Sequence, residues 1–216
     1  MFAEMLTRLG FYVGENADLL EPQADNPKGF WERRDVVQLN NLILEEAGGS
    51  WFNPPTLPYK NDYTSEMIAI LDRVSSSGTQ WLIKDPRLIL TWPLWQELLG
   101  SAVRVIIYRS PVSVARSLRN RHGFPLSFGL DLWEYYNKRD LILFRDPRNS
   151  LFLSYDKFIH DPEGEIDLLC QGLLSLGVLD NDDIDFSRAL AAFSPTLINS
   201  KSGQHEHDNK VMTSTQ

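Results

Sequence analysis

The sequence VRVIIYRSPVSVARSLRNR at residues 103–121 decides the fold that we predict. It opens with an apolar run rich in β-branched residues, from Val103 to Tyr108, which is typical of a buried β-strand. Pro111 follows a tight turn, and proline is favoured in the first turn of a helix. Apolar residues then recur at helical spacing, so the stretch predicts a strand, a turn and a helix.

The turn between this strand and this helix is a candidate anion site. Arg109 stands at the carboxyl end of the strand, and Ser117 lies eight residues later on the helix. In open α/β sheets, ligands bind outside the carboxyl ends of the strands. The stretch holds five arginines and no acidic residue, in a chain of net charge −8. This favours a small anionic ligand, although a surface arginine beside an unrelated helical serine is the plainer alternative.

The composition indicates a folded protein with one sizeable core. The 216 residues are 43% hydrophobic and 11% aromatic, which predicts a single folded domain. We place this domain at residues 1–199, because residues 200–216 are polar and are expected to form a disordered tail. The acidic balance argues against broad binding to nucleic acids or anionic membranes. Cys170 is the single cysteine, so a disulfide within the chain is not possible. The sequence has neither a membrane-spanning apolar run nor a leader. We therefore expect a cytoplasmic protein.

Strand and helix patterns alternate along the chain. Short apolar runs at residues 80–84 and 150–154 predict two further strands, and residues 11–13 are at most a strand edge. We expect Asp35 to cap one helix and Pro93 to lie near the start of another. The alternation predicts an α/β fold with helices on both faces of a parallel sheet. Besides the helix after Pro111, helices are predicted at residues 1–9, 36–47, 64–74, 88–99, 130–146, 162–176 and 186–193.

Two further patches carry side chains suited to group transfer. Lys84 ends the predicted strand 80–84, where a lysine can neutralise charge on a transferring group. Asp85 and Arg87 follow, and an internal ion pair that shapes the turn explains them as readily. Glu32 follows the rigid aromatic pair at residues 30–31. It is a candidate general base, with a surface glutamate as the plainer alternative.

The remaining patterns favour structural roles. Tyr155 and Asp156 stand at the end of the strand at residues 150–154, where a structural hydrogen-bonding pair is favoured over a catalytic one. His205 and His207 lie in the tail without a nearby cysteine, so no metal site is expected. Neither G-x-x-x-x-G-K-[ST] nor G-x-G-x-x-G occurs, which removes the direct case for an ATP, GTP or NAD site.

Taken together, these patches resemble the sulfotransferase family that uses 3′-phosphoadenosine 5′-phosphosulfate (PAPS). The similarity is greatest to bacterial-type members related to the carbohydrate sulfotransferases. The matching segments occur in family order, cover most of the chain and are fairly specific as a set. They are NPKGFWE at 26–32, WLIKDPRL at 81–88, VIIYRSPVSVARSLRNR at 105–121, LWEYYNKRDL at 132–141 and LSYDKFIHDP at 153–162.

The resemblance implies a three-layer, P-loop NTPase-like parallel sheet and a sulfuryl transfer without a metal. The acceptor would be a hydroxyl of a carbohydrate or small molecule. Arg109 and Ser117 match the residues that bind the 3′-phosphate of PAPS. Lys84 resembles the strand-end lysine near the transferred group. The acceptor requires a base, for which Glu32 is the first candidate and Asp85 the second.

The family pattern also includes an N-terminal strand and a G-x-P-R-S-G-T-S loop that hold the 5′-phosphosulfate. The sequence given opens at Met1 with what resembles the helix after that loop. We expect either a true start upstream of Met1, which the intact later motifs favour, or an inactive relative. A non-catalytic binding or scaffold protein is therefore the alternative function, and a nucleotide-dependent kinase is the third. Residues 50–62 and 122–129 would select the acceptor, whose identity the sequence does not reveal.

Overall fold

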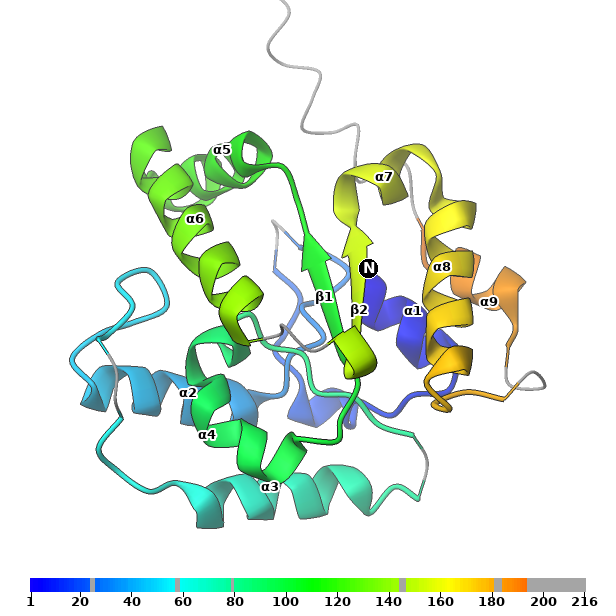
Figure 1. Cartoon of the computed structure of the whole chain (residues 1–216), viewed down its shortest axis with the longest axis horizontal. Coiled ribbons are helices and arrows are strands. Elements are labelled where there is room, and N and C mark those ends of the chain that lie inside the picture. The colour runs from blue at the N-terminus through cyan, green and yellow to red at the C-terminus, as the bar shows by residue number, and fades with distance from the viewer. Residues whose placement is uncertain (24–25, 57–58, 79, 144–146, 181–183, 194–216) are drawn as a thin grey trace, which may run out of the picture.

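The computed structural model describes residues 1–23, 26–56, 59–78, 80–143, 147–180 and 184–193. The tail predicted to be disordered, with His205 and His207, lies outside these residues. Within them, the chain is an α/β protein in which helices predominate around a small parallel sheet (Figure 1). The elements are α1 (Phe2–Arg8), η1 (Asn16–Asp18), α2 (Arg34–Glu46), α3 (Thr64–Ser75), α4 (Leu88–Leu99), β1 (Arg104–Tyr108), α5 (Pro111–His122), α6 (Leu126–Leu143), η2 (Pro147–Asn149), β2 (Ser150–Ser154), α7 (Tyr155–His160), α8 (Pro162–Ser175) and α9 (Phe186–Leu190).

The sheet of the described residues consists of β1 and β2. The two strands pair in parallel over their whole length, from Arg104 opposite Ser150 to Tyr108 opposite Ser154. This confirms two of the predicted strands and the strand–turn–helix at residues 103–121, because α5 begins at Pro111 directly after the turn. The fold class is therefore α/β, with a smaller sheet than the sequence predicts.

The third predicted strand, at residues 80–84, forms one isolated parallel bridge, between Trp81 and Tyr12. The Tyr12 amide donates to the Gln80 carbonyl at 2.7 Å, and the Tyr12 carbonyl accepts from the Leu82 amide at 2.9 Å. Residues 11–13 and 80–84 therefore run side by side as a short parallel pair. The prediction of a full strand at 80–84 is wrong, because only one neighbouring residue pairs with it.

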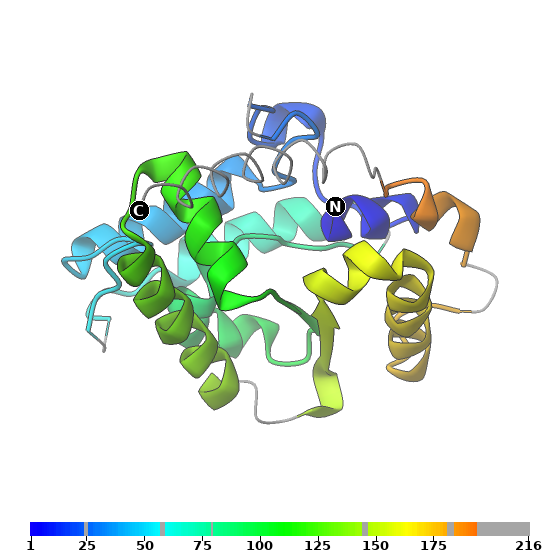
Figure 2. The ribbon, with the colours of Figure 1, turned by 90° about the horizontal axis from the view of Figure 1, so that it is seen from above.

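Two hydrophobic cores lie on opposite faces of β1. Val105 packs against the first core and Ile106 against the second, because successive residues of a strand point to opposite faces. Figures 1 and 2 show α1 and α7–α9 on one side of the strands and α2, α4 and α6 on the other. The first core includes Met5, Phe158, Ile166, Leu169 and Leu173, and the second includes Val36, Ile43, Leu44, Met67 and Trp95.

Three predicted helix boundaries are wrong. Arg33, not Asp35, is the N-cap of α2, and Asp35 lies in the first turn. Pro93 lies inside α4 rather than near its start, and the neighbouring Leu90 carbonyl accepts a hydrogen bond from the Tyr59 hydroxyl at 2.9 Å. α6 begins at Leu126, four residues before the predicted start, because the turn after α5 is short.

A buried arginine fixes the start of α2. Arg33 is 2% exposed, and its guanidinium forms two hydrogen bonds to the Asp35 carboxylate, at 3.0 and 2.8 Å. Arg73 of α3 also lies 3.1 Å from Asp35. Burial opposes the ionisation of Asp35. The hydrogen bond and charge of Arg33, with hydrogen bonds from Arg73 and the Val36 amide, outweigh burial and keep the pKa of Asp35 below its ordinary value of 3.8. The carboxylate therefore stabilises the folded chain at neutral pH.

We predict that Asp35→Asn lowers the free energy of unfolding by about 2 kcal/mol at pH 7, because it removes the closer of the two carboxylates that pair with buried Arg33 and leaves only Asp18, at 3.5 Å. The lowered pKa also predicts that this contribution is fully present above pH 3.8 and disappears as pH falls through the pKa of the folded state. Urea unfolding of both chains between pH 7 and pH 3 measures each effect. Asp72→Asn, on the exposed face of α3, is the matched control. Equal stability of the Asp35→Asn chain and its parent at pH 7 would contradict the role of this pair.

Candidate functional site

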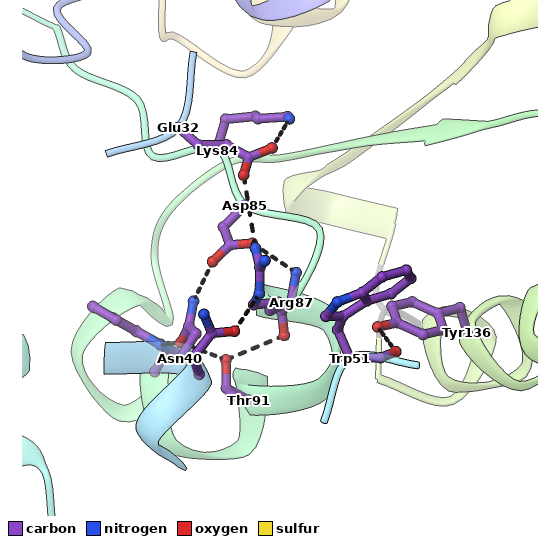
Figure 3. A network of polar contacts seen from close by, with 10 residues as sticks. Glu32, Asn40, Trp51, Lys84, Asp85, Arg87, Thr91 and Tyr136 are labelled. Atoms are coloured by element: carbon purple, nitrogen blue, oxygen red, sulfur yellow. Dashed lines mark hydrogen bonds and ion pairs between the residues drawn. The ribbon is translucent and has the colours of Figure 1, made fainter. Parts of the chain in front are cut away.

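Lys84 and Glu32 meet at the carboxyl end of residues 80–84, although 52 residues separate them in sequence (Figure 3). The Lys84 ammonium forms an ion pair with Glu32 Oε1, and Arg87 Nη1 lies 3.7 Å from Glu32 Oε2. The Glu32 side chain is 7% exposed, whereas that of Lys84 is 37% exposed. The site thus combines a buried carboxylate with a cation that reaches solvent.

A strained residue places Glu32. Trp31 has a φ of 57°, in the left-handed region that few residues other than glycine adopt. Such a conformation persists only where its surroundings enforce it. Here the Glu32 carbonyl accepts a hydrogen bond from the Leu20 amide at 2.8 Å, and Leu19 pairs with Arg33 in an antiparallel bridge. The plainer alternative of a surface glutamate is therefore wrong, because the Glu32 side chain points inward.

Asp85, the second candidate base, has both carboxylate oxygens engaged. Oδ1 accepts from the Arg87 amide at 2.9 Å and from Arg87 Nη1 at 2.8 Å. Oδ2 accepts from the Asn40 side chain at 2.9 Å. The Asp85 side chain is fully buried. The predicted Asp85–Arg87 ion pair that shapes the turn is therefore present, and it leaves Asp85 without a free oxygen that faces solvent.

Asn40 of α2 joins this turn to α4, and the sequence reasoning missed it (Figure 3). Besides donating to Asp85, its side-chain oxygen accepts from the Thr91 hydroxyl and from Trp95 Nε1, each at 2.9 Å. Asn40 is completely buried. The signal in the sequence was an asparagine on the apolar face of a helix, between Val36 and Leu44. Such a residue requires partners, because a buried unpaired amide is costly.

Arg109 lies at the carboxyl end of β1 with one donor unsatisfied. Its guanidinium carbon is 4.4 Å from the centroid of the Tyr155 ring, a cation–π contact. Its Nε is buried and has no hydrogen-bond partner among the described residues. Asp156 accepts from the Ser110 amide at 2.6 Å, which confirms the predicted structural role of this residue. Trp31 Nε1 and Arg139 Nε are also buried donors without a partner among the described residues, but Arg109 is the one that lies at the carboxyl end of a strand, which makes it the candidate for an anion.

Ser117 lies in α5, partly exposed, at a position that the packing of α5 on α6 determines. Gly129 of α6 permits this packing, because a Cβ there would lie 2.8 Å from the Ala115 Cα. Within the described part of the chain, no hydrogen bond or ion pair joins Ser117 to Arg109. The strand–turn–helix thus holds both residues on connected elements without a direct contact.

The two loops expected to select an acceptor meet in a cluster of aromatic rings. His122 stacks on Phe124 with centroids 5.4 Å apart, and the Trp51 ring centroid lies 5.2 Å from that of His122. The Tyr136 hydroxyl donates to the Trp51 carbonyl at 2.7 Å and so anchors the first loop to α6 (Figure 3). Phe52 is 41% exposed, so the cluster presents an apolar surface to solvent. We call it the aromatic cluster, formed by Trp51, Phe52, His122, Phe124 and Phe128.

Neither a metal centre nor a membrane span is found in the described part of the chain. No three residues among its His, Cys, Asp and Glu side chains come together in a way that would hold a metal ion. No described helix is both long enough and apolar enough to cross a bilayer.

Comparisons of the chain with protein-family models, with curated proteins and with solved structures find no match. The resemblance to sulfotransferases therefore remains a prediction that rests on the motifs and on the positions of their residues.

We predict that Asn40→Ala lowers the free energy of unfolding by about 2–3 kcal/mol, because it leaves the buried donors and acceptors of Asp85, Thr91 and Trp95 without their partner. Urea unfolding followed by tryptophan fluorescence measures the change, since the Trp95 indole is bound to Asn40. Gln38→Ala, at an exposed position of the same helix, should change stability by less than about 0.5 kcal/mol. Equal effects of the two substitutions would show that the hydrogen bonds of Asn40 do not stabilise the contact between α2, α4 and the turn at Asp85.

Proposed function

We propose that this chain is a sulfotransferase-type protein that transfers a sulfuryl group from PAPS to a hydroxyl of a carbohydrate or small molecule. We further propose that its strands belong to the three-layer, P-loop-like arrangement that the resemblance implies. The observation that carries the proposal is the buried Nε of Arg109 at the end of β1, which has no hydrogen-bond partner among the described residues. A second strand-like segment, residues 80–84, ends in Lys84, which forms an ion pair with the buried Glu32 carboxylate.

The donor substrate fits the chemistry of Arg109. A guanidinium binds phosphate oxygens with two parallel hydrogen bonds, and the free Nε supplies one of these donors. The cation–π contact with Tyr155 orients the guanidinium before any ligand binds. Ser117 would add a hydroxyl donor from α5. The 3′-phosphate of PAPS is therefore the group that we assign to this pair of residues.

Glu32 is the favoured base for the acceptor hydroxyl, because Asp85 is saturated by Arg87 and Asn40. In the proposed reaction, the acceptor oxygen bonds to sulfur as the bond between sulfur and the bridging oxygen breaks. The electron pair leaves with adenosine 3′,5′-bisphosphate, and the acceptor proton passes to Glu32. Lys84 has the exposure and length to turn from Glu32 toward the charge that develops on the bridging oxygen.

The aromatic cluster is the proposed acceptor surface. Apolar ring faces suit the C–H face of a sugar or an aromatic alcohol. Tyr136 anchors the cluster to α6, and burial raises its pKa, an effect that the charge of Arg87 opposes. Because Tyr136 stays protonated at neutral pH, its hydrogen bond holds Trp51 in position throughout the physiological range.

We predict that Arg109→Ala weakens the binding of adenosine 3′,5′-bisphosphate by about 10- to 100-fold, because a charge-assisted hydrogen bond to phosphate is lost. Isothermal titration calorimetry measures the affinity, and adenosine 5′-monophosphate, which lacks the 3′-phosphate, is the comparison ligand. The preference for the bisphosphate should disappear in the variant. Arg116→Ala, at an exposed position of α5, is the matched control.

Two results would contradict the donor assignment. An Arg109→Ala chain that keeps its preference for the bisphosphate would show that another residue binds the 3′-phosphate. A parent chain that binds adenosine 5′-monophosphate as tightly as the bisphosphate would show that the 3′-phosphate has no binding site of its own. Binding of the bisphosphate without transfer to any acceptor would favour the non-catalytic alternative.

We predict that Glu32→Gln lowers turnover by about 100-fold or more, because the amide cannot accept the acceptor proton. Release of adenosine 3′,5′-bisphosphate from PAPS, with a panel of monosaccharides and phenols as acceptors, measures the rate. The affinity for the bisphosphate should stay within about twofold of the parent, since Glu32 does not contact the proposed donor site. Glu97→Gln, at an exposed position of α4, is the control. An unchanged rate in Glu32→Gln would remove Glu32 as the base.

A further inference from the structure

The outer edge of β2 has no neighbouring strand in the described part of the chain. β2 pairs with β1 along its other edge. The Ser154 amide donates to Glu165 Oε2 at 3.0 Å, so it points away from β1. Because the backbone groups of alternate residues in a strand point to opposite edges, Phe152 also directs its amide and carbonyl away from β1. Backbone groups on such an edge are a template for pairing with another chain.

An uncharged groove of about 310 Å³ lies between this edge and α8, which Figures 1 and 2 show beside β2. Phe152 is 42% exposed, and Leu168 of α8 is 51% exposed. No residue that lines the groove is charged, although charged residues make up 23% of the chain. Exposed apolar side chains beside an unpaired edge mark an interaction surface. The groove is lined by residues 150–153 of β2 and by Leu168, Gln171, Gly172 and Ser175 of α8.

The sequence of β2 is self-complementary. Residues 150–154 read Ser-Leu-Phe-Leu-Ser, which is the same in both directions and contains neither the lysine nor the proline that commonly block a sheet edge. In an antiparallel pair of two such strands centred on Phe152, leucine lies opposite leucine, serine lies opposite serine, and Phe152 lies opposite its own counterpart. The two Phe152 residues would exchange two backbone hydrogen bonds. Aromatic and aliphatic pairs across strands stabilise such a sheet.

The charges at the two ends of this edge are also complementary. Arg148 lies just before β2 and is exposed. α8 carries Glu163 and Glu165 in its first turn, and the bond between Glu165 and Ser154 places this acidic turn at the far end of β2. An antiparallel pair would therefore bring the Arg148 end of each copy to the acidic turn of the other. A two-fold contact forms each such attraction twice.

We propose that two copies of this chain associate through β2, in an antiparallel pair that is centred on Phe152 and continues the sheet across a two-fold axis. Leu151 and Leu153 pack on the core that includes α8, so the exposed Leu168 of each copy would close the groove on that face. The two Phe152 rings would lie together on the opposite face. A second copy fits this edge because the strand and its charged ends are complementary to themselves. The proposal is independent of the proposed sulfuryl transfer.

Sedimentation velocity of the full chain between about 5 and 500 μM tests the association, because a small interface dissociates in this range. We expect the mass to rise from 24.8 kDa toward twice that value as the concentration increases. Hydrogen exchange at both concentrations locates the contact without a substitution. The Phe152 amide should exchange about tenfold more slowly at the higher concentration, because it gains a hydrogen bond to the second copy.

Substitutions at the axis test the register. Phe152→Lys and Phe152→Glu each place two like charges directly opposite one another, so each variant alone should stay monomeric. An equimolar mixture of the two should form a dimer, because lysine then faces glutamate. Leu168→Lys, in the groove, should weaken association by about tenfold or more and provides a second variant that leaves β2 unchanged. Leu42→Lys, at a similarly exposed position of α2, is the matched control and should associate as the parent does.

Three results would overturn the proposal. A parent chain that is monomeric at about 500 μM would exclude a second copy as the occupant of this edge. A dimer that neither Phe152→Lys nor Leu168→Lys weakens, or whose Phe152 amide gains no protection, would have its interface elsewhere. Monomeric Phe152→Lys and Phe152→Glu chains that do not associate when mixed would exclude the two-fold pairing at Phe152.

Discussion

The site depends on the pairing of one buried carboxylate. Asp85 follows directly after Lys84, and its two oxygens are held by Arg87 and by Asn40. Asn40 in turn accepts from two side chains of α4, so the turn, α2 and α4 are tied at a single point. Because Asp85, Asn40 and their partners on α4 are buried, each of these polar groups requires the others. Their geometry sets the direction in which Lys84 leaves the strand-like segment and therefore where it meets Glu32.

Saturated and unsatisfied polar groups separate structural from functional candidates in this chain. Every side-chain polar atom of Asp85 and Asn40 has a hydrogen-bond partner in the protein, which fits a supporting role. Arg109 has a buried Nε without a protein partner, which fits a role toward a ligand. Glu32 lies between these cases, since its cationic partner Lys84 is partly exposed and long enough to move. The division follows from the cost of leaving a buried polar group unpaired, which a bound anion would remove at Arg109.

Much of the fold could be predicted because its elements are local. The run at residues 103–108 and the proline after it gave the correct strand, turn and helix, and β2 and most helices were also correct. The run at residues 80–84 misled the prediction, because its apolar residues do face two cores but only one neighbour pairs with it. The prediction that Asp35 caps α2 was wrong, because Arg33 is the N-cap and the Asp35 carboxylate pairs with Arg33 and Arg73.

By itself, the sequence determined the α/β class and the positions of Arg109, Lys84 and Asp85 at the ends of apolar runs, because periodicity and turn residues act over a few positions. Tertiary structure alone decided that Glu32 is buried against Lys84, that Asp85 is saturated and that Arg109 has a free donor. These properties arise from contacts between residues far apart in the chain, which no local pattern encodes.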